Sequence, residues 1–331
     1  MHCILEDVRD QNDSRDQSGT TDGQAPDGEN IVKLRIFEIV FAAMIASIGG
    51  TAAVQAQSSP AREPVAADSG PKTLLEGILG STEKDKGKEG SDGEEHLDAD
   101  RPHFPEATTT VGKGRAILES GYTFTKKGDS FLSHTVPEAL LRVGMFADWF
   151  EFRIGQDTLH QRQTVEEVTA TANGAKDLYL GVKLALTEQK GWLPATVVIP
   201  QMTVPTGSAE VTAGRVLPGV NVDFGWEVIK DVFNIELLVA NNFVQDELGN
   251  SRHELATGLT GAFQLTKKLE LFAEWDAFYP TAGASPASRH YAVGGVVYFV
   301  TPNLQLDMRA GVGLNHNSND FLAGVGFAAR Y

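Results

Sequence analysis

The chain has 331 residues, a formal net charge of −16, a hydrophobic fraction of 41% and one cysteine. Its mean hydropathy of −0.18 excludes a multi-helix membrane protein, which needs several apolar runs of about 20 residues. The acidic balance argues against nucleic acid as a partner, because a nucleic-acid interface is basic. A lone cysteine, Cys3, cannot form an intramolecular disulfide or a zinc site, and no motif indicates a cofactor.

The negative charge is concentrated near the N-terminus. Residues 1–31 carry eight acidic and two basic residues, and residues 57–100 carry eleven and five. Both segments are polar and lack an apolar period, which is typical of disordered chain. We predict a disordered or untranslated extension over 1–31 and a disordered acidic linker over 57–99. Within the linker, 73–79 could form two helical turns, although a transient helix is the plainer interpretation.

Residues 32–56 have the order of a secretory signal peptide. Lys33 and Arg35 precede an apolar run from Ile36 to Val54, and the small-residue cleavage pattern Val54-Gln55-Ala56 ends it. Because such signals normally begin a chain, we expect translation to start at codon 32. A transmembrane anchor is the alternative, which the short run and its Glu38 disfavour.

From Arg115 to Tyr331 the dominant period is two. In 177–186, for example, leucine and valine alternate with Asp177, Tyr179, Gly181 and Lys183. Successive side chains of a strand point to opposite faces, so one face is apolar and the other carries charges and glycine. About twelve such segments of roughly ten residues can be drawn, which predicts an all-β domain over 115–331.

The joins between these segments alternate in length. Short joins are expected near 147–148, 188–191, 230–231, 266–267 and 302, and longer ones near 126–133, 158–176, 205–217, 245–252, 280–288 and 315–319. Short turns at one end and long loops at the other are typical of an outer-membrane barrel. We therefore predict a transmembrane antiparallel β-barrel of about 12 strands, with a secreted soluble β protein as the alternative. The terminal Tyr331 resembles the signal read by the bacterial barrel-assembly machinery.

Three blocks resemble a known family. They are Asp100-Arg101-Pro102 with Phe104, Glu106, Thr108–Val111 and Gly114; Leu118–Phe124; and His134–Glu138 with Leu141–Gly144 and Trp149–Arg153. The chain over 98–331 resembles the bacterial outer-membrane proteins labelled "putative MetA-pathway of phenol degradation". The resemblance implies an outer-membrane barrel associated by name with the uptake of aromatic compounds.

The polar face of the expected strands supplies candidates for a charged constriction. Such a constriction would pass or reject solutes by the sign of their charge, and the excess of acids favours cations. The alternative is that these residues pair with one another and only rigidify the barrel. The candidates are Glu119, Glu138, Arg142, Glu151, Arg153, Lys183, Asp223, Glu236, Glu274, Asp307 and Arg309.

The segment 100–114 precedes the first expected strand and is rich in threonine. It could fold into the barrel mouth as a plug, in which case Arg101 would pair with lumen carboxylates. An ordered lead-in along the rim is the alternative.

The sequence does not indicate an enzyme. His316, Ser318 and Asp320 lie close together, but a nucleophile needs an oriented base, and an exposed turn explains them better. We expect an outer-membrane channel for passive or facilitated uptake of small solutes, aromatic or hydrophobic ones among them, with its linker in the periplasm. Its partners would be outer-membrane lipid, the barrel-assembly machinery and a small-molecule solute. A closed structural or anchoring barrel without transport is the alternative.

Overall fold

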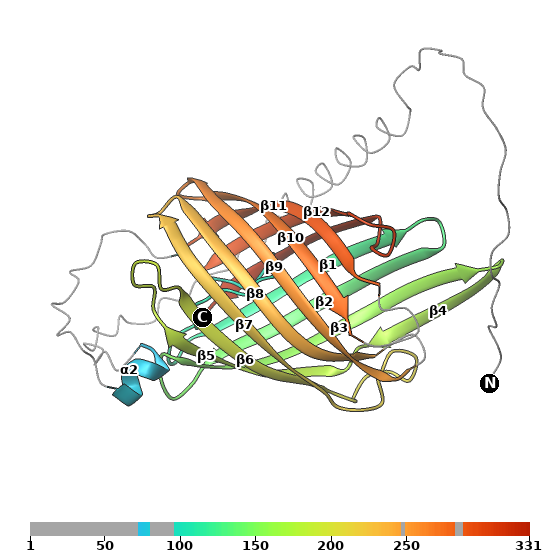
Figure 1. Cartoon of the computed structure of the whole chain (residues 1–331), viewed down its shortest axis with the longest axis horizontal. Coiled ribbons are helices and arrows are strands. Elements are labelled where there is room, and N and C mark those ends of the chain that lie inside the picture. Colours follow the sequence, from blue (N-terminus) through green and yellow to red (C-terminus); the bar gives the residue numbers. More distant parts are fainter. Residues whose placement is uncertain (1–71, 80–95, 246–248, 282–286) are drawn as a thin grey trace, which may run out of the picture. The chain divides into compact units, whose positions relative to one another are not determined.

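The computed structural model describes residues 72–79, 96–245, 249–281 and 287–331 (Figure 1). All of them belong to one unit, Ala67–Tyr331. The predicted extension over 1–31, the predicted signal peptide over 32–56 and most of the predicted linker over 57–99 lie outside the described residues.

One short helix and thirteen strands make up the described secondary structure. In chain order they are α2 (Leu74–Leu79), β1 (Ala116–Lys127), β2 (Phe131–Gly144), β3 (Phe150–Val165), β4 (Val168–Ala175), β5 (Leu178–Thr187), β6 (Ala195–Val204), β7 (Leu217–Ile229), β8 (Phe233–Gln245), β9 (Ser251–Thr266), β10 (Leu269–Pro280), β11 (Arg289–Thr301), β12 (Leu304–Gly313) and β13 (Phe321–Arg330).

Twelve of these strands form a closed antiparallel barrel. Each strand pairs with its neighbours in the chain, β3 pairs with β5, and the ring closes where β1 pairs with β13 from Ile117↔Arg330 to Lys126↔Phe321. Closure leaves no unpaired strand edge within the ring of twelve, which a sheet in hydrocarbon requires. The prediction of a barrel of about 12 strands is confirmed. In the described part of the chain, no helix has the length and apolar character needed to cross a membrane.

The thirteenth strand, β4, corrects one expected loop. We expected a long join over 158–176, but β3 continues to Val165 and β4 returns beside it, in register from Val165↔Val168 to Thr158↔Ala175. Figure 1 shows this hairpin extending beyond the neighbouring strands. Both of its faces are largely exposed, so its sequence lacks the apolar alternation that identified the other strands. The expected join over 126–133 was also too long, because only residues 128–130 separate β1 from β2.

The two ends of the barrel differ. The turns at 145–149, 188–194, 230–232, 267–268 and 302–303 lie at the end where β1 begins and β13 finishes, which we call the short-turn end. There the backbone N–H of Ala116 bonds to the oxygen of Tyr331 over 3.1 Å. The β3–β4 hairpin, the turn 128–130 and the joins 205–216 and 314–320 lie at the opposite end, the loop end, where β8 and β10 also finish.

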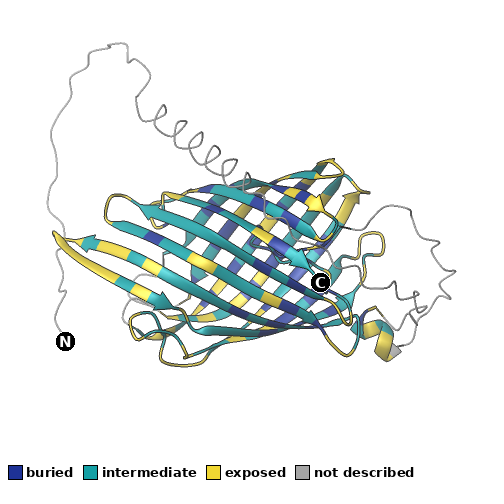
Figure 2. Ribbon diagram, turned by 180° about the vertical axis from the view of Figure 1, so that it is seen from behind, coloured by how far each residue is buried: buried dark blue, intermediate teal, exposed yellow. Residues whose placement is uncertain are grey.

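Burial alternates along the strands, as Figure 2 shows. In β9, residues 254, 256, 258, 260 and 262 are buried, whereas Leu255, Leu259 and Phe263 are exposed. The exposed positions form the apolar outer face that a barrel presents to lipid. The buried side of the wall includes fully covered charged side chains such as Arg142, Glu151 and Lys183. The interior is therefore polar, and these charges need partners.

Candidate functional site in the barrel lumen

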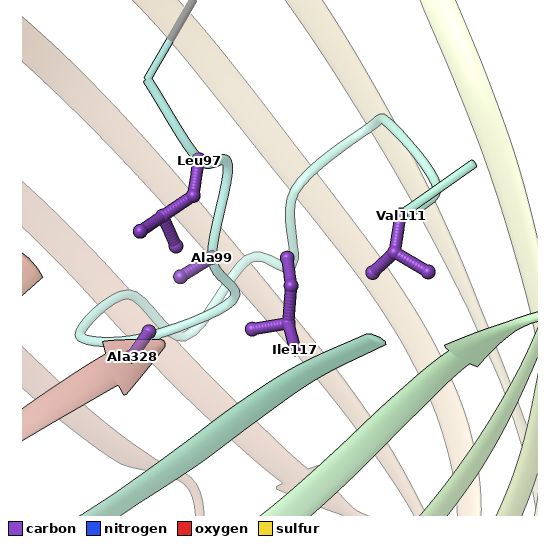
Figure 3. Packing of buried hydrophobic residues seen from close by; sticks show 5 residues of the cluster. All are labelled: Leu97, Ala99, Val111, Ile117 and Ala328. Atoms are coloured by element: carbon purple, nitrogen blue, oxygen red, sulfur yellow. The ribbon is translucent and has the colours of Figure 1, made fainter. Parts of the chain in front are cut away.

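Residues 96–114, which we call the inner segment, lie inside the barrel. The backbone N–H of Leu97 donates to the oxygen of Pro302 over 2.8 Å at the short-turn end. Leu97, Ala99 and Val111 pack with two lumen-facing wall residues, Ile117 of β1 and Ala328 of β13 (Figure 3). Residues 96–99, which we had assigned to the linker, thus lie with the segment 100–114. This small apolar cluster anchors a segment whose other contacts are mostly polar.

Asp100 lies among three wall cations. Its carboxylate is 2.7 Å from Arg153 Nη2, 2.7 Å from Lys183 Nζ and 3.3 Å from Arg142 Nη1. It also accepts a hydrogen bond from the backbone N–H of Ala107, 3.1 Å away. Burial alone would raise the pKa of Asp100, but the three cations hold this pKa below its ordinary value. Asp100 is therefore an anion that joins β2, β3 and β5 through the lumen.

The same cations also bind wall carboxylates. Arg142 donates to both oxygens of Glu151, at 2.8 and 3.0 Å, and to Glu119 Oε1 at 3.1 Å. Glu119 in turn accepts from the backbone N–H groups of Asp100 and Arg101 at 3.1 and 3.0 Å. Buried charges are stable only when they are paired and hydrogen-bonded. Here the inner segment supplies part of that pairing.

Arg101 binds the adjoining part of the wall, from β2 to β12. Its Nη1 is 2.9 Å from Glu138 Oε2 on β2, and its Nη2 is 3.2 Å from Asp307 Oδ1 on β12. Gly121 and Gly326 lie beneath the guanidinium, and a Cβ at either position would overlap it. Consecutive residues of the inner segment, Asp100 and Arg101, therefore occupy a cationic and an acidic part of the wall.

The remaining inner segment is held by backbone bonds to wall charges. Glu274 accepts from the N–H of Phe104 and Asp223 from the N–H of Glu106, both over 2.9 Å. Arg309 donates to the oxygen of Pro102 over 2.7 Å. These bonds fix the backbone of the inner segment against β7, β10 and β12.

His103 lies over the acidic face of β10. Its ring is 3.7 Å from Glu270 and 3.8 Å from Glu274, and it makes an edge contact with Phe272. Burial opposes protonation, but Glu270, Glu236 and Glu274 raise the pKa of His103 to about 9. His103 is thus the second positive side chain of the inner segment, after Arg101, that faces acidic residues of the wall.

The structure brings nearly all of the sequence-predicted residues onto the inner segment. Of the eleven wall candidates, Glu236 differs: it lies on β8 in register with Gly225 and Thr260 and acts on the inner segment electrostatically, through His103. The ten that contact the inner segment are Glu119, Glu138, Arg142, Glu151, Arg153, Lys183, Asp223, Glu274, Asp307 and Arg309. Arg142 and Lys183 are covered completely, and Arg153, almost as fully covered, borders a cavity with one edge.

Sequence reasoning missed the partners on the inner segment. Asp100, His103 and Glu106 were not among the predicted site residues, although Asp100 directly precedes Arg101. The glycines of the lumen face were noted without a role. A glycine that alternates in phase with wall charges, as Gly121 does with Glu119, is a signal for close approach of a second segment.

Two cavities lie above the inner segment, toward the loop end. The first, about 240 Å³, borders Arg101, Glu106, Glu138, Asp157 and Arg309. The second, about 340 Å³, is lined by apolar and amide side chains that include Leu159, Tyr179, Gln201, Asn242 and Val244. The lumen therefore contains space beside the inner segment and toward the loop end.

The cluster of His316, Ser318 and Asp320 serves the loop between β12 and β13. Ser318 Oγ donates to the backbone oxygen of His290 over 2.8 Å, and Asp320 accepts from the N–H of Gly128 over 2.6 Å. These bonds tie the loop to its neighbours. No group of three or more His, Cys, Asp or Glu among the described residues is arranged to hold a metal ion.

Fold and interior together define the class: a twelve-stranded antiparallel barrel of the outer-membrane type, with the segment that precedes β1 inside the lumen. The chain belongs to the family described as "Putative MetA-pathway of phenol degradation", whose model matches residues 99–331. The family resemblance seen in the sequence is thereby confirmed. A comparison with curated proteins finds no match.

Two solved structures illustrate the likeness. An outer membrane channel from Pseudomonas putida F1 is 14% identical with a TM-score of 0.57, over 68% of this chain and 98% of that one. The translocator domain of the autotransporter NalP from Neisseria meningitidis is 13% identical with a TM-score of 0.43, over 66% of this chain and 88% of that one. The first similarity supports the barrel fold.

Proposed function

We propose that the protein is an outer-membrane channel for small solutes and that the inner segment is its plug. One observation carries the proposal: the segment inside the lumen is held mainly by ion pairs and hydrogen bonds to the wall rather than by strand pairing. Such a segment can shift while every backbone bond of the barrel remains. Solute would enter the cavities at the loop end, contact the wall charges and leave past the displaced segment.

The proposed orientation follows from the same arrangement. Both barrel termini lie at the short-turn end, which in outer-membrane barrels faces the periplasm. The acidic linker would then lie in the periplasm, and assembly would use the barrel-assembly machinery. The family description supports aromatic or hydrophobic compounds as a solute class, and the excess of acidic side chains on the predicted lumen face favours cations among ions.

A disulfide between the inner segment and the wall tests the channel and its plug together. Thr108 Cβ lies 3.2 Å from the position that a Cβ of Gly225 would occupy, close to the spacing of a disulfide. We would introduce Thr108→Cys and Gly225→Cys, with Cys3→Ser, and record single-channel conductance in a planar bilayer. Each single-cysteine variant is the control.

We expect discrete conductance steps from the reduced protein and their loss on oxidation, with recovery after reduction. Equal conductance in the oxidised and reduced states would show that the inner segment does not gate the lumen. Silence in both states, from protein shown to be folded, would support the closed structural barrel instead.

A further inference from the structure

The guanidinium of Arg101 lies against one row of residues that crosses four neighbouring strands. Glu138 of β2 is in register with Gly121 of β1, Gly121 with Gly326 of β13, and Gly326 with Asp307 of β12. The row therefore reads acid, glycine, glycine, acid. Its two ends carry negative charge, and its middle has no side chains.

The guanidinium of Arg101 matches this row. Nη1 bonds to Glu138 at one end over 2.9 Å, while Nη2 and Nε lie 3.2 and 3.4 Å from the two oxygens of Asp307 at the other. Nη2 also lies 3.3 Å from the backbone oxygen of Val325. Because a Cβ on Gly121 or Gly326 would overlap the guanidinium, the wall forms a flat slot of about the size of that group.

The shape of the slot selects among cations. A guanidinium is planar and presents donors along both edges, so it can bind two carboxylates that lie on opposite sides of it. An ammonium group is a compact point charge that would reach one carboxylate at a time. The carboxylates of Glu138 and Asp307 at the two ends, with only glycine between them, therefore favour a planar cation.

One end of the slot borders free space. Glu138 is 21% exposed and Arg101 12%, whereas Asp307 is fully covered. The cavity of about 240 Å³ borders both Arg101 and Glu138. A solute that enters from the loop end thus meets the Glu138 end of the slot first.

We propose that this slot is a binding site for solutes bearing a guanidinium or amidinium group, which compete with Arg101 and thereby loosen the inner segment. The proposal rests on the proposed channel function, since it names a solute class for that lumen. Under this proposal, Arg101 occupies the slot in the absence of solute and holds the inner segment in place until the guanidinium or amidinium group of a solute replaces it. No covalent step is involved.

The test removes Arg101 and supplies its head group free in solution. The midpoint of thermal unfolding of the full chain would be measured in detergent for Arg101→Ala, with guanidinium or methylguanidinium chloride at millimolar concentration. Sodium and tetramethylammonium chloride at the same concentration are the ionic controls. We expect Arg101→Ala to lower the midpoint, and the planar cations alone to restore most of the loss.

A second variant locates the effect. Adding Gly326→Ala to Arg101→Ala places a methyl group in the slot and should abolish the rescue. Equal stabilisation by sodium, or an undiminished rescue in the double variant, would overturn the proposal. If Arg101→Ala does not refold, the yield of folded protein with each cation present during refolding becomes the readout, with the same expected order.

Conductance separates this proposal from the channel function. An Arg101→Ala protein that conducts but shows no selective response to guanidinium would leave the channel standing and overturn the slot. A selective response in a protein that never conducts would support the slot as a binding site and overturn the channel.

Discussion

Arg142 on β2 and Arg153 on β3 occupy directly opposite positions of neighbouring strands. Like charges in such positions destabilise a strand pair. Asp100 lies between them, 3.3 Å from Arg142 and 2.7 Å from Arg153, so a residue outside the sheet joins the wall carboxylate Glu151, which contacts both arginines, in offsetting this repulsion. The wall and the inner segment are thus electrostatically incomplete without each other.

Replacing Asp100 should expose this dependence. Asp100→Asn keeps the shape of the side chain but removes the charge that faces Arg142, Arg153 and Lys183. Breaking a buried ion pair from one side costs about 3–5 kcal/mol, so we expect a loss of that order in the free energy of unfolding. Chemical unfolding in detergent measures it.

The matched control is Asp157→Asn. Asp157 pairs with Lys176 over 2.9 Å, but both side chains are substantially exposed, and such pairs contribute at most about 1 kcal/mol. If the two variants lost equal stability, the buried network around Asp100 would not be a distinct source of stability.

Gly326→Ala should displace Arg101 while sparing the barrel. The new methyl group would overlap the guanidinium, which is the far end of a flexible side chain. We expect a loss of about 1–3 kcal/mol, as for other overpacked sites, together with raised conductance because the inner segment is loosened. Thermal unfolding and single-channel recording measure the two effects.

Gly294→Ala is the corresponding control on β11. Its Cβ would meet the nearest atom, the oxygen of Phe272, at 3.4 Å, an ordinary contact. It tests the effect of adding a methyl group to a strand glycine without touching Arg101. Raised conductance in this variant would mean that the gain in Gly326→Ala does not come from Arg101.

His103 should make the stability of the protein depend on pH. Its pKa rises from 6.5 to about 9 on folding, so protonated His103 stabilises the folded state fully below pH 6.5. This contribution is lost as pH rises through 9. The midpoint of thermal unfolding should therefore differ most between the wild type and His103→Asn at low pH, and the two should converge at high pH.

His160→Asn, on the projecting β3–β4 hairpin, is the control for that measurement. Its ring lies on exposed strand and contacts Asn173, away from the inner segment. A wild-type advantage over His103→Asn that stays constant from pH 6 to 10 would contradict the role assigned to His103.

Leu259 tests the lipid-facing surface. It lies on the outer face of β9 and is 46% exposed. An arginine at the bilayer midplane costs about 2–4 kcal/mol in such barrels and about 0–1 near the interfaces. Leu259→Arg should therefore impair folding into lipid vesicles, whereas Leu314→Arg, beyond the end of β12, should impair it little. Equal effects would argue against a lipid-facing band at Leu259.

The strands of the barrel wall could be predicted from the sequence because alternation is a pattern of neighbouring residues. In β5, alternation alone separates the covered Gly181 and Lys183 from Leu180 and Val182. The alternation of short and long joins then assigns the two ends of each strand to the two ends of the barrel, and Tyr331 marks the final strand. The β3–β4 hairpin escaped detection because both of its faces meet solvent, so no alternation between covered and exposed positions shaped its sequence.

The contents of the lumen were decided by tertiary structure. Lys183 meets Asp100 across 83 positions of the chain, and Arg101 meets Asp307 across 206. Alternation tells which side of the wall a charge faces but not which charge lies across from it. The partner depends on closure of the ring and on the inner segment folding into it. The sequence by itself therefore determined the barrel. Only the closed barrel determined that Asp100 lies among the wall cations and Arg101 between the wall carboxylates.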